Sequence, residues 1–430
     1  MNITEIARKI IQEGPICNHC LGRQFAKLST CLGNYERGRS IKIYLTMEGD
    51  RIFKDDNDDS LLKELSPSNP IARKLTDIEP EDETCWVCLG LFDNLEWWAE
   101  RAVSEMEAFE YDNFLVGTSM SGLLSENEEI LWTESGTVYA EQLKSELNRE
   151  IGKRINAITG KEVDFENPDI VVMLDLTKED VLLEVRSVYI YGRYRKLVRG
   201  IPQTRWPCRK CRGKGCEVCG FTGKQYEESV DEIISDQVQK TLHCIDTKFH
   251  GSGREDIDAL MLGDGRPFVI EAVRPIYRHF DINRLQEDIN NFAEGKVEVN
   301  ELKSVSRDVI ETLKSSKADK VYKLKVTFNE PVSEEKLKSA INTLSGVDIE
   351  QRTPQRVSHR RGDLIRKRHV HNIELSDLTH NHAIITVNCE GGLYVKELIS
   401  GDEGRTEPNL SDIIGTQAEV TELDVIKVNL

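Results

Sequence analysis

Eight of the eleven cysteines lie in four Cys-x-x-Cys pairs, a spacing that lets two sulfurs from one tight turn reach the same metal ion. Two of these pairs, Cys17/Cys20 and Cys85/Cys88, are far apart in the chain, yet each is followed by Leu-Gly. The repeated motif predicts two similar turns that share one zinc ion, with separate or metal-free pairs as the alternative. Because four thiolates leave no open coordination position, this ion is expected to be structural.

A second set of cysteines is more compact and consists of Cys208, Cys211, Cys216 and Cys219. The glycines between and after them favour tight turns. This spacing predicts a second zinc site. A redox-active pair, or a Cys-Gly knuckle similar to those of a chaperone family, is the alternative.

The segment 250–271 (HGSGREDIDALMLGDGRPFVIE) combines glycines, carboxylates and arginines and leads into an apolar stretch. It lacks the Gly-Lys-Ser/Thr sequence of a phosphate-binding loop and the glycine spacing of a dinucleotide-binding turn. A solvated Gly-rich turn is one interpretation. The other is a reactive carboxylate, Asp256, close to Arg254, because a neighbouring cation keeps an aspartate ionised and able to act as nucleophile or base.

The residues Gly253 to Asp256 resemble the Gly-Arg-x-Asp element that carries the single required aspartate of several pseudouridine synthase groups. The longer string 253–271 is most similar to the Pus-ten-type group of archaea and many eukaryotes. Three further segments agree with that group: Lys320-Val321-Tyr322, GGLYVKEL with Lys396, and GDEGRTEPNL at 401–410. The similarity covers most of the chain and is strongest between residues 200 and 415.

This resemblance implies that Asp256 is the catalytic nucleophile, with Asp258 and Asp264 as nearby alternatives. It also implies that no organic cofactor is needed, which agrees with the missing nucleotide-binding motifs. The target uridine must leave the RNA stack to reach a buried carboxylate, at a cost of roughly a few kcal/mol.

Three other residues receive roles from the same resemblance. Tyr322 is expected to stack on the flipped base, although a core tyrosine on an alternating strand is the alternative. Arg254 and Lys396 are expected to be charge partners of Asp256 that lower its pKa. Many synthases have an arginine at the position of Lys396, and a lysine there loses the bidentate geometry.

Two basic segments are predicted to bind RNA, since cations meet phosphates while aromatic and arginine planes stack on bases. The first begins in QRTPQRVSHRR, which resembles the group's RNA-binding loop, and the second is the tyrosine-rich stretch 189–199. A solvated charged face is the alternative for both. The predicted RNA-binding cations are Arg356, Arg360, Arg361, Arg366, Lys367, Arg368, Arg193, Arg195 and Lys196.

The elements expected to position these residues follow from apolar periodicity. Helices are predicted at 3–11, 142–158 and about 394–399, a hairpin from 170–175 and 181–188, and strands at 268–273, 320–328 and 382–388. Together with the resemblance, they predict an α+β fold in four parts. These are a zinc-binding extension (1–104), a THUMP-like α/β RNA-binding domain (105–205), a Cys/Gly-rich knuckle (206–223) and a pseudouridine synthase catalytic domain with a mixed or antiparallel sheet (224–430).

The chain has 430 residues and a formal net charge of −18. It contains no apolar run long enough to span a bilayer and no secretory signal, so a cytoplasmic protein with no membrane partner is expected. The acidity argues weakly against bulk electrostatic binding of RNA, but a local basic patch still binds phosphate. No sequence feature indicates a protein partner.

These observations predict a tRNA pseudouridine synthase with structural zinc. The resemblance to archaeal members implies uridines of the TΨC arm, at tRNA positions 54 and 55. One alternative is another THUMP-bearing tRNA enzyme, such as a methyltransferase or thiolation enzyme, whose cofactor loop we do not find. The other is a non-catalytic zinc-containing tRNA-binding protein.

Overall fold

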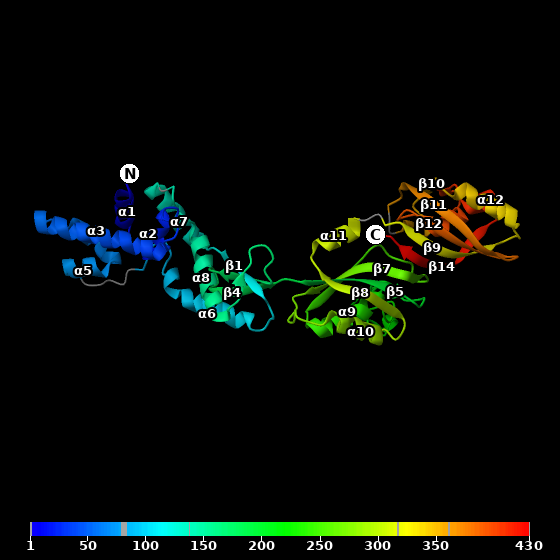
Figure 1. Cartoon of the computed structure of the whole chain (residues 1–430), viewed down its shortest axis with the longest axis horizontal. Helices are drawn as coiled ribbons and strands as arrows, with labels where there is room; N and C mark the ends of the chain where they lie inside the picture. The colour runs from blue at the N-terminus through cyan, green and yellow to red at the C-terminus, as the bar shows by residue number, and fades with distance from the viewer. Residues whose placement is uncertain (1, 79–83, 137, 316–317, 360–361, 430) are drawn as a thin grey trace. The chain divides into compact units, whose positions relative to one another are not determined.

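The computed structural model describes residues 2–78, 84–136, 138–315, 318–359 and 362–429. The chain forms two compact units, Met1–Arg186 and Ser187–Leu430, each with its own hydrophobic core (Figure 1). The helices of the first unit are α1 (Ile3–Gln12), α2 (Asn18–Gly22), α3 (Asn34–Asp56), α4 (Ser60–Leu65), α5 (Pro70–Thr76), α6 (Leu95–Met106), α7 (Gly122–Ser135) and α8 (Leu143–Thr159). Its strands are β1 (Asn113–Ser119), β2 (Glu162–Val163), β3 (Ile170–Asp175) and β4 (Asp180–Val185).

The sheet of the first unit has the order β2-β1-β3-β4. Strand β1 runs parallel to β2 and β3, and β4 returns antiparallel to β3. Alternate residues of β3, including Val172 and Leu174, are fully buried in the same core as Leu147 and Ile151 of α8. The hairpin predicted from 170–175 and 181–188 is therefore confirmed, and so are the helices predicted at 3–11 and 142–158.

The second unit carries the larger sheet. Its strands are β5 (Val188–Lys196), β6 (Asp246–Gly251), β7 (Leu260–Val273), β8 (Val297–Val305), β9 (Lys320–Phe328), β10 (Val347–Arg352), β11 (Ile365–Leu378), β12 (His382–Cys389), β13 (Thr406–Glu407) and β14 (Ala418–Val428). Its helices are α9 (Val230–Leu242), α10 (Ile282–Phe292), α11 (Asp308–Ser315), α12 (Glu334–Leu344), α13 (Gln355–Ser358), α14 (Val395–Ser400) and α15 (Leu410–Ile414).

The strand order is β13-β10-β11-β12-β9-β14-β7-β5-β8, with β6 paired to β7. All these neighbours are antiparallel except β14 and β7, which are parallel, so the predicted mixed sheet is confirmed. The strands predicted at 320–328 and 382–388 and the helix predicted near 394–399 are confirmed as β9, β12 and α14.

Strand β7 begins at Leu260, eight residues before the predicted start. Two of the glycines that suggested a turn, Gly263 and Gly265, lie within the strand and have φ angles of +58° and +77°. A Cβ atom on Gly263 would lie 2.0 Å from the carbonyl oxygen of Ile426. Glycine therefore lets β7 approach β14 closely at this point.

The segment 188–196 was expected in the region 105–205, but it forms β5 within the second unit. Its backbone pairs with β7 on one side and β8 on the other, which places it inside the large sheet. The Cys/Gly-rich segment also lies in this unit. Its one helical piece among the described residues is the 3₁₀ turn Glu217–Cys219, and a bridge between Pro207 and Lys224 closes its ends.

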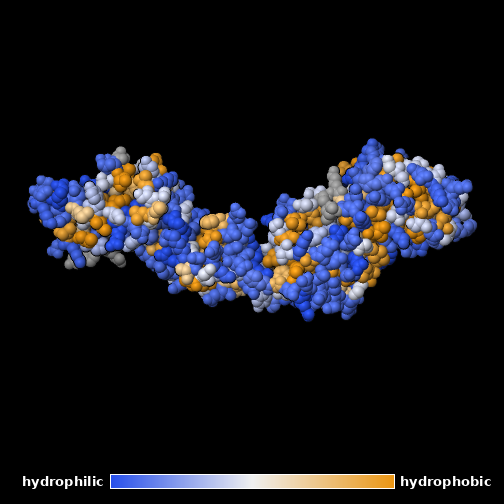
Figure 2. All heavy atoms as spheres, viewed as in Figure 1, coloured by the Kyte–Doolittle hydropathy of each residue, from blue (hydrophilic) through white to orange (hydrophobic). Residues whose placement is uncertain are grey.

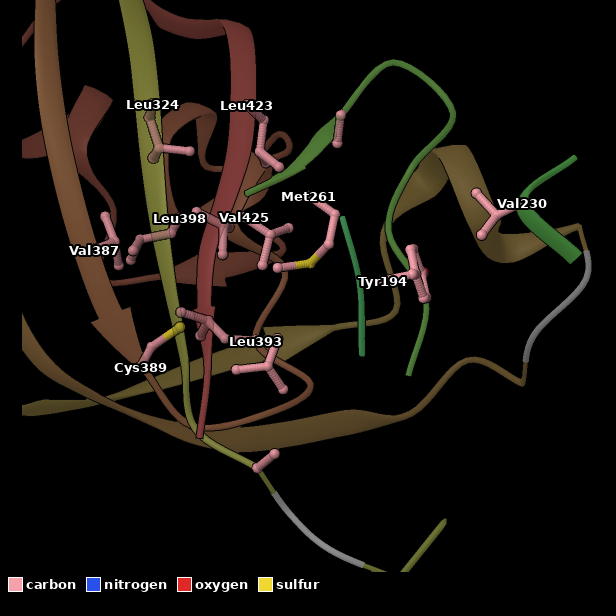
Figure 3. Close-up of a cluster of buried hydrophobic side chains, with 14 of the residues drawn as sticks. Tyr194, Val230, Met261, Leu324, Val387, Cys389, Leu393, Leu398, Leu423 and Val425 are labelled. Carbon is pink, nitrogen blue, oxygen red and sulfur yellow. The ribbon is translucent and has the colours of Figure 1, made fainter. Parts of the chain in front are cut away.

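The core of the second unit lies directly beneath its central strands. Figure 3 shows Leu324 of β9, Val387 of β12, Val425 of β14 and Met261 of β7, and each side chain is at most 1% exposed. This packing joins strands that are distant in sequence, and it fixes the strand ends that carry the site described below.

Hydrophilic residues cover most of the visible face of both units (Figure 2). Among the helices of the described residues, none combines the length and apolar composition of a membrane span.

Candidate active site

The loop between β6 and β7 carries Glu255 and Asp256, and a buried ion pair anchors it. The carboxylate of Glu255 lies 2.8 Å from Nε of Arg266 on β7, and the two side chains are 0% and 1% exposed. The Tyr194 hydroxyl of β5 contacts both Glu255 oxygens, at 2.9 and 2.8 Å. Burial, reinforced by the Glu255 charge, raises the pKa of Tyr194, so its hydroxyl stays a proton donor.

The backbone of this loop is held by three further side chains. Arg266 Nη1 donates to the carbonyl of Ser252 at 2.7 Å, and Gln203 donates to the carbonyl of Gly253 at 3.0 Å. Lys196 donates to the carbonyls of Asp256 and Ile257 at 3.2 and 3.1 Å. The loop is thus fixed on both sides of Glu255, and this fixes the backbone of Asp256.

Lys196 was predicted to bind RNA, and its place in the structure corrects that prediction. Its side chain is 0% exposed, and its ammonium donates hydrogen bonds to the carbonyls of Ile201, Asp256 and Ile257. Burial lowers its pKa. No phosphate can reach this lysine without unfolding the loop.

The carboxylate of Asp256 faces two cations from other elements. Its Oδ2 lies 3.4 Å from Nη1 of Arg356 on α13 and 3.5 Å from Nζ of Lys396 on α14. Arg356 also pairs with Glu397 at 2.6 Å, and Lys396 with Asp258 at 3.0 Å. Burial tends to raise the pKa of Asp258, but the hydrogen bond and charge of Lys396 bring it below its ordinary value. These four contacts bring α13, α14 and the loop together.

Asp256, Arg356 and Lys396 line a cavity of about 270 Å³. Tyr322, Leu393, Leu423 and Val425 also line it, so its wall includes aromatic and apolar surface beside the cations. Burial raises the pKa of Tyr322, which keeps its phenol neutral. The arrangement suits a flat, uncharged ring against the apolar wall and an anionic backbone at the rim.

Arg254 also lines this cavity, but its contact is with an aromatic ring. Its guanidinium lies over the Trp206 ring, 5.5 Å from Cζ to the ring centroid, a cation–π geometry. Within the described residues, no ion pair joins Arg254 to Asp256. The structure brings Lys396 to Asp256 as expected. The second cation beside Asp256 is Arg356, which was predicted as an RNA-binding residue.

The other cations of the tyrosine-rich segment make contacts inside the second unit. Arg193 donates to the carbonyls of Asp264, Gly265 and Val428 at 2.8 to 3.2 Å. Arg195 pairs with Glu298 of β8. Both side chains therefore stabilise the sheet.

The first basic segment is divided between two elements and does not form one loop. Arg366, Lys367 and Arg368 lie on β11, because residues 365–370 pair with β10. Lys367 is 64% exposed, whereas Arg366 donates to the Thr353 hydroxyl at 3.0 Å. Arg360 and Arg361 lie outside the described residues.

The predicted metal ligands converge in both clusters. The sulfurs of Cys17, Cys20, Cys85 and Cys88 all lie within 4.8 Å of one another, and so do those of Cys208, Cys211, Cys216 and Cys219. Both sets can hold a metal ion.

The two clusters differ in their surroundings. In the first, three of the four cysteines are buried, and the fully buried Arg23 donates to Cys20 Sγ at 2.8 Å. In the second, one cysteine is buried. Backbone N–H groups of Gly215 and Gly223 donate to its sulfurs at 3.2 and 3.3 Å. Four sulfur donors with hydrogen bonds directed at them match the chemistry of a structural zinc site.

Sequence reasoning missed Glu255, Arg266 and Glu397 as parts of the site. Arg266 offered a signal, because an arginine at the start of an apolar strand needs a buried anion as partner. Glu255 and Glu397 offered none, since their partners come from distant segments.

Comparison with known proteins identifies the family. The family description "Pus10, C-terminal" matches residues 189–429, and "Pus10 THUMP domain, archaeal" matches residues 98–175. The chain is 51% identical to the tRNA pseudouridine synthase Pus10 of Methanothrix thermoacetophila, over 99% of this chain and 94% of that protein. For the proteins of the same name from Methanocaldococcus jannaschii and Pyrococcus furiosus, the identities are 41% and 37%. These alignments cover 100% and 99% of this chain and 95% and 98% of those proteins.

The two family matches and the similar proteins show that the chain is an RNA-modifying enzyme of the pseudouridine synthase class. The chain belongs to the Pus10 family of tRNA pseudouridine synthases.

The buried contacts of Glu255 with Arg266 and Tyr194 lead to a prediction about stability. Replacing Glu255 by glutamine leaves the Arg266 charge buried without its anion, which costs about 3–5 kcal/mol of unfolding free energy. Tyr194→Phe removes the hydrogen bond that the hydroxyl donates to Glu255 and the one it accepts from Gln203, and is expected to cost about 1–3 kcal/mol. Urea unfolding followed by fluorescence measures both.

The matched control is Glu298→Gln, which breaks the exposed pair with Arg195 on the same sheet. It is expected to cost less than about 1 kcal/mol. Equal losses for Glu255→Gln and Glu298→Gln would show that the buried pair does not anchor the loop.

Proposed function

We propose that Asp256 is the single catalytic nucleophile of this enzyme and that its substrates are uridines 54 and 55 in the TΨC arm of tRNA. The observation that carries the role of Asp256 is its carboxylate, held between Arg356 and Lys396 at 3.4 and 3.5 Å at the edge of the cavity that Tyr322 lines. The tRNA positions rest on the resemblance to archaeal members of the group.

The contacts of the site support each part of this proposal. Arg356 and Lys396 hold the Asp256 carboxylate at the edge of the cavity, where it can attack or deprotonate the sugar–base unit. The neutral ring of Tyr322 offers a surface on which a flipped uracil can stack. The buried contacts of Glu255 with Arg266 and Tyr194 hold the loop, and with it the Asp256 carboxylate, in place. A reaction between positioned groups requires such a fixed geometry.

Asp256→Asn keeps the shape of the side chain and removes its charge. We expect it to lower pseudouridine formation by at least about 10⁴-fold, with tRNA binding unchanged. The measurement is pseudouridine mapping on unmodified tRNA transcripts, including transcripts with cytidine at position 54 or 55. The matched control, Asp264→Asn, changes an exposed carboxylate eight residues further on and should stay active.

Retained activity in Asp256→Asn would refute the nucleophile assignment. Modification outside positions 54 and 55 would refute the proposed substrate. If the wild-type protein binds tRNA but modifies none, a non-catalytic tRNA-binding protein becomes the better description.

We also propose that the exposed cations beside the site on β11 bind tRNA phosphates. Lys367→Ala is expected to weaken tRNA binding and to reduce by about 1 the slope of log affinity against log salt concentration, because one phosphate contact is lost. Filter binding between low and moderate salt measures this slope. The control is Lys338→Ala on α12, which has a similar exposure of 60% and also pairs with a carboxylate. An equal change in both variants would refute the assignment.

We further propose that both cysteine clusters bind structural zinc and that the protein works in the cytoplasm, whose reducing conditions keep such cysteines available to metal. Elemental analysis should find two zinc ions per chain, one in Cys219→Ser, and two in the control Cys31→Ser, which changes an exposed cysteine outside both clusters. A chelator should remove the ion of the less buried second cluster first. One ion or none in the wild-type protein would contradict this proposal.

A further inference from the structure

The cavity beside Asp256 is also lined by Lys320, the first residue of β9. Within the described part of the chain, its ammonium has no hydrogen bond and no ion pair. The other cations of the cavity differ in this respect, since Arg266, Arg356 and Lys396 each pair with a carboxylate and Arg254 lies over the Trp206 ring. Lys320 is therefore a cation available to a ligand in this cavity.

The position of the ammonium follows from the backbone around it. A Cβ atom on Gly253 would lie 3.0 Å from Lys320 Nζ and 3.3 Å from Arg266 Nη1. Gly253 also has a φ of +76°. The glycine thus leaves room for the ammonium against the loop, three residues before Asp256. Tyr322, two residues along the same strand, lines the same cavity.

Several elements surround Lys320. Arg266 faces it from β7 and Glu255 from the loop, while its register partners on β12 and β14 are Cys389 and Val428. Burial, with a contribution from the charge of Arg266, lowers the pKa of Lys320 to about 8, although Cys389 and Glu255 oppose the shift. Because the lowered pKa still lies above neutrality, the side chain is a cation at pH 7 and loses its charge as pH rises through about 8.

We propose that Lys320 is a catalytic residue that donates a hydrogen bond to a carbonyl oxygen of the target uracil and stabilises the negative charge on the base when it leaves the ribose. This inference rests on the proposed function, because it places the uracil in the cavity of Asp256. The family assignment does not depend on it.

The step conserves atoms and electrons. The C1′–N1 bond breaks, its electron pair stays on the base, and the ring spreads that charge onto the carbonyl oxygens. Lys320 keeps its proton and holds the anionic base by a charge-assisted hydrogen bond. After the base rotates, C5 forms a bond to C1′, the proton on C5 is lost, and N1 takes up a proton. No oxidant or cofactor is needed.

The other cations are less suited to this role. Arg266 is held by Glu255, and the charges of Arg356 and Lys396 face Asp256, Glu397 and Asp258. The guanidinium of Arg254 is engaged in a cation–π contact with Trp206. A cation that already pairs with a carboxylate stabilises a new anion less. An ammonium without such a partner, in a cavity partly shielded from water, stabilises the new anion more.

The test uses single-turnover conversion of a tRNA transcript by full-length enzyme. Lys320→Met is expected to slow conversion by about 10²-fold, the usual cost of removing one preorganised donor, with tRNA affinity within about twofold of wild type. Lys320→Arg keeps the charge and should recover part of the rate. The control Lys323→Met changes an exposed lysine on the same strand and should react at the wild-type rate.

Two readouts separate catalysis from a structural role. The wild-type rate should fall above about pH 8 as Lys320 loses its proton, and in Lys320→Arg this fall should move to higher pH. Fluorine at C5 makes uracil a better leaving group, so the loss in Lys320→Met should be smaller on a transcript made with 5-fluorouridine. The loss of the parent nucleoside, followed by chromatography, measures both rates.

A rate within about threefold of wild type in Lys320→Met, with Asp256→Asn inactive, would overturn this inference and leave the proposed function standing. Equal losses on uridine and 5-fluorouridine transcripts, or an unmoved pH profile in Lys320→Arg, would also overturn it. If Lys320→Met does not fold, which circular dichroism would show, the Lys320→Arg profile decides. Full activity of Asp256→Asn would remove the proposed function and the inference together.

Discussion

A buried ion pair between Glu255 and Arg266 is the constraint on which the site depends. Such a pair is costly to desolvate, and it persists because Tyr194 satisfies the carboxylate and the Ser252 carbonyl satisfies the guanidinium. Its two members come from the loop and from β7. The pair therefore ties the backbone of Asp256 to the central sheet and gives its carboxylate the fixed position that the proposed chemistry requires.

The site also shows how local cations allow an acidic protein to bind a polyanion. The chain carries a net charge of −18, yet the cavity gathers Arg356, Lys396 and Lys320 beside the Asp256 carboxylate. Coulomb interactions are short-ranged at physiological salt, so the local arrangement matters more than the total charge. The pairing of most of these cations with carboxylates keeps the site stable before RNA arrives.

Much of the architecture follows from local sequence. Alternating apolar residues predict β9 and β12 with their observed starts, since one face of each strand must be buried. The Cys-x-x-Cys pairs predict two clusters because a tight turn brings paired sulfurs to one point. The Gly-Arg-Glu-Asp motif and Lys396 also meet, as the family resemblance implies.

What sequence could not supply are the contacts between distant segments. Nothing local distinguishes Lys196, which supports the loop from below, from the exposed Lys367. The place of β5 in the large sheet depends on backbone pairing with β7 and β8. The basic residues of this strand therefore could not show to which domain it belongs. Arg356 takes the place beside Asp256 that was expected for Arg254 for the same reason, since tertiary packing decides which cation reaches Asp256.

The most direct test of this account is a structure of the enzyme bound to tRNA whose target uridine is replaced by 5-fluorouridine. The account predicts the flipped nucleotide in the cavity, with its ring on Tyr322 and its sugar–base unit about 3–3.5 Å from the Asp256 carboxylate or bonded to it. It also predicts a base carbonyl within hydrogen-bond distance of Lys320. A target nucleotide bound away from this cavity would contradict the account.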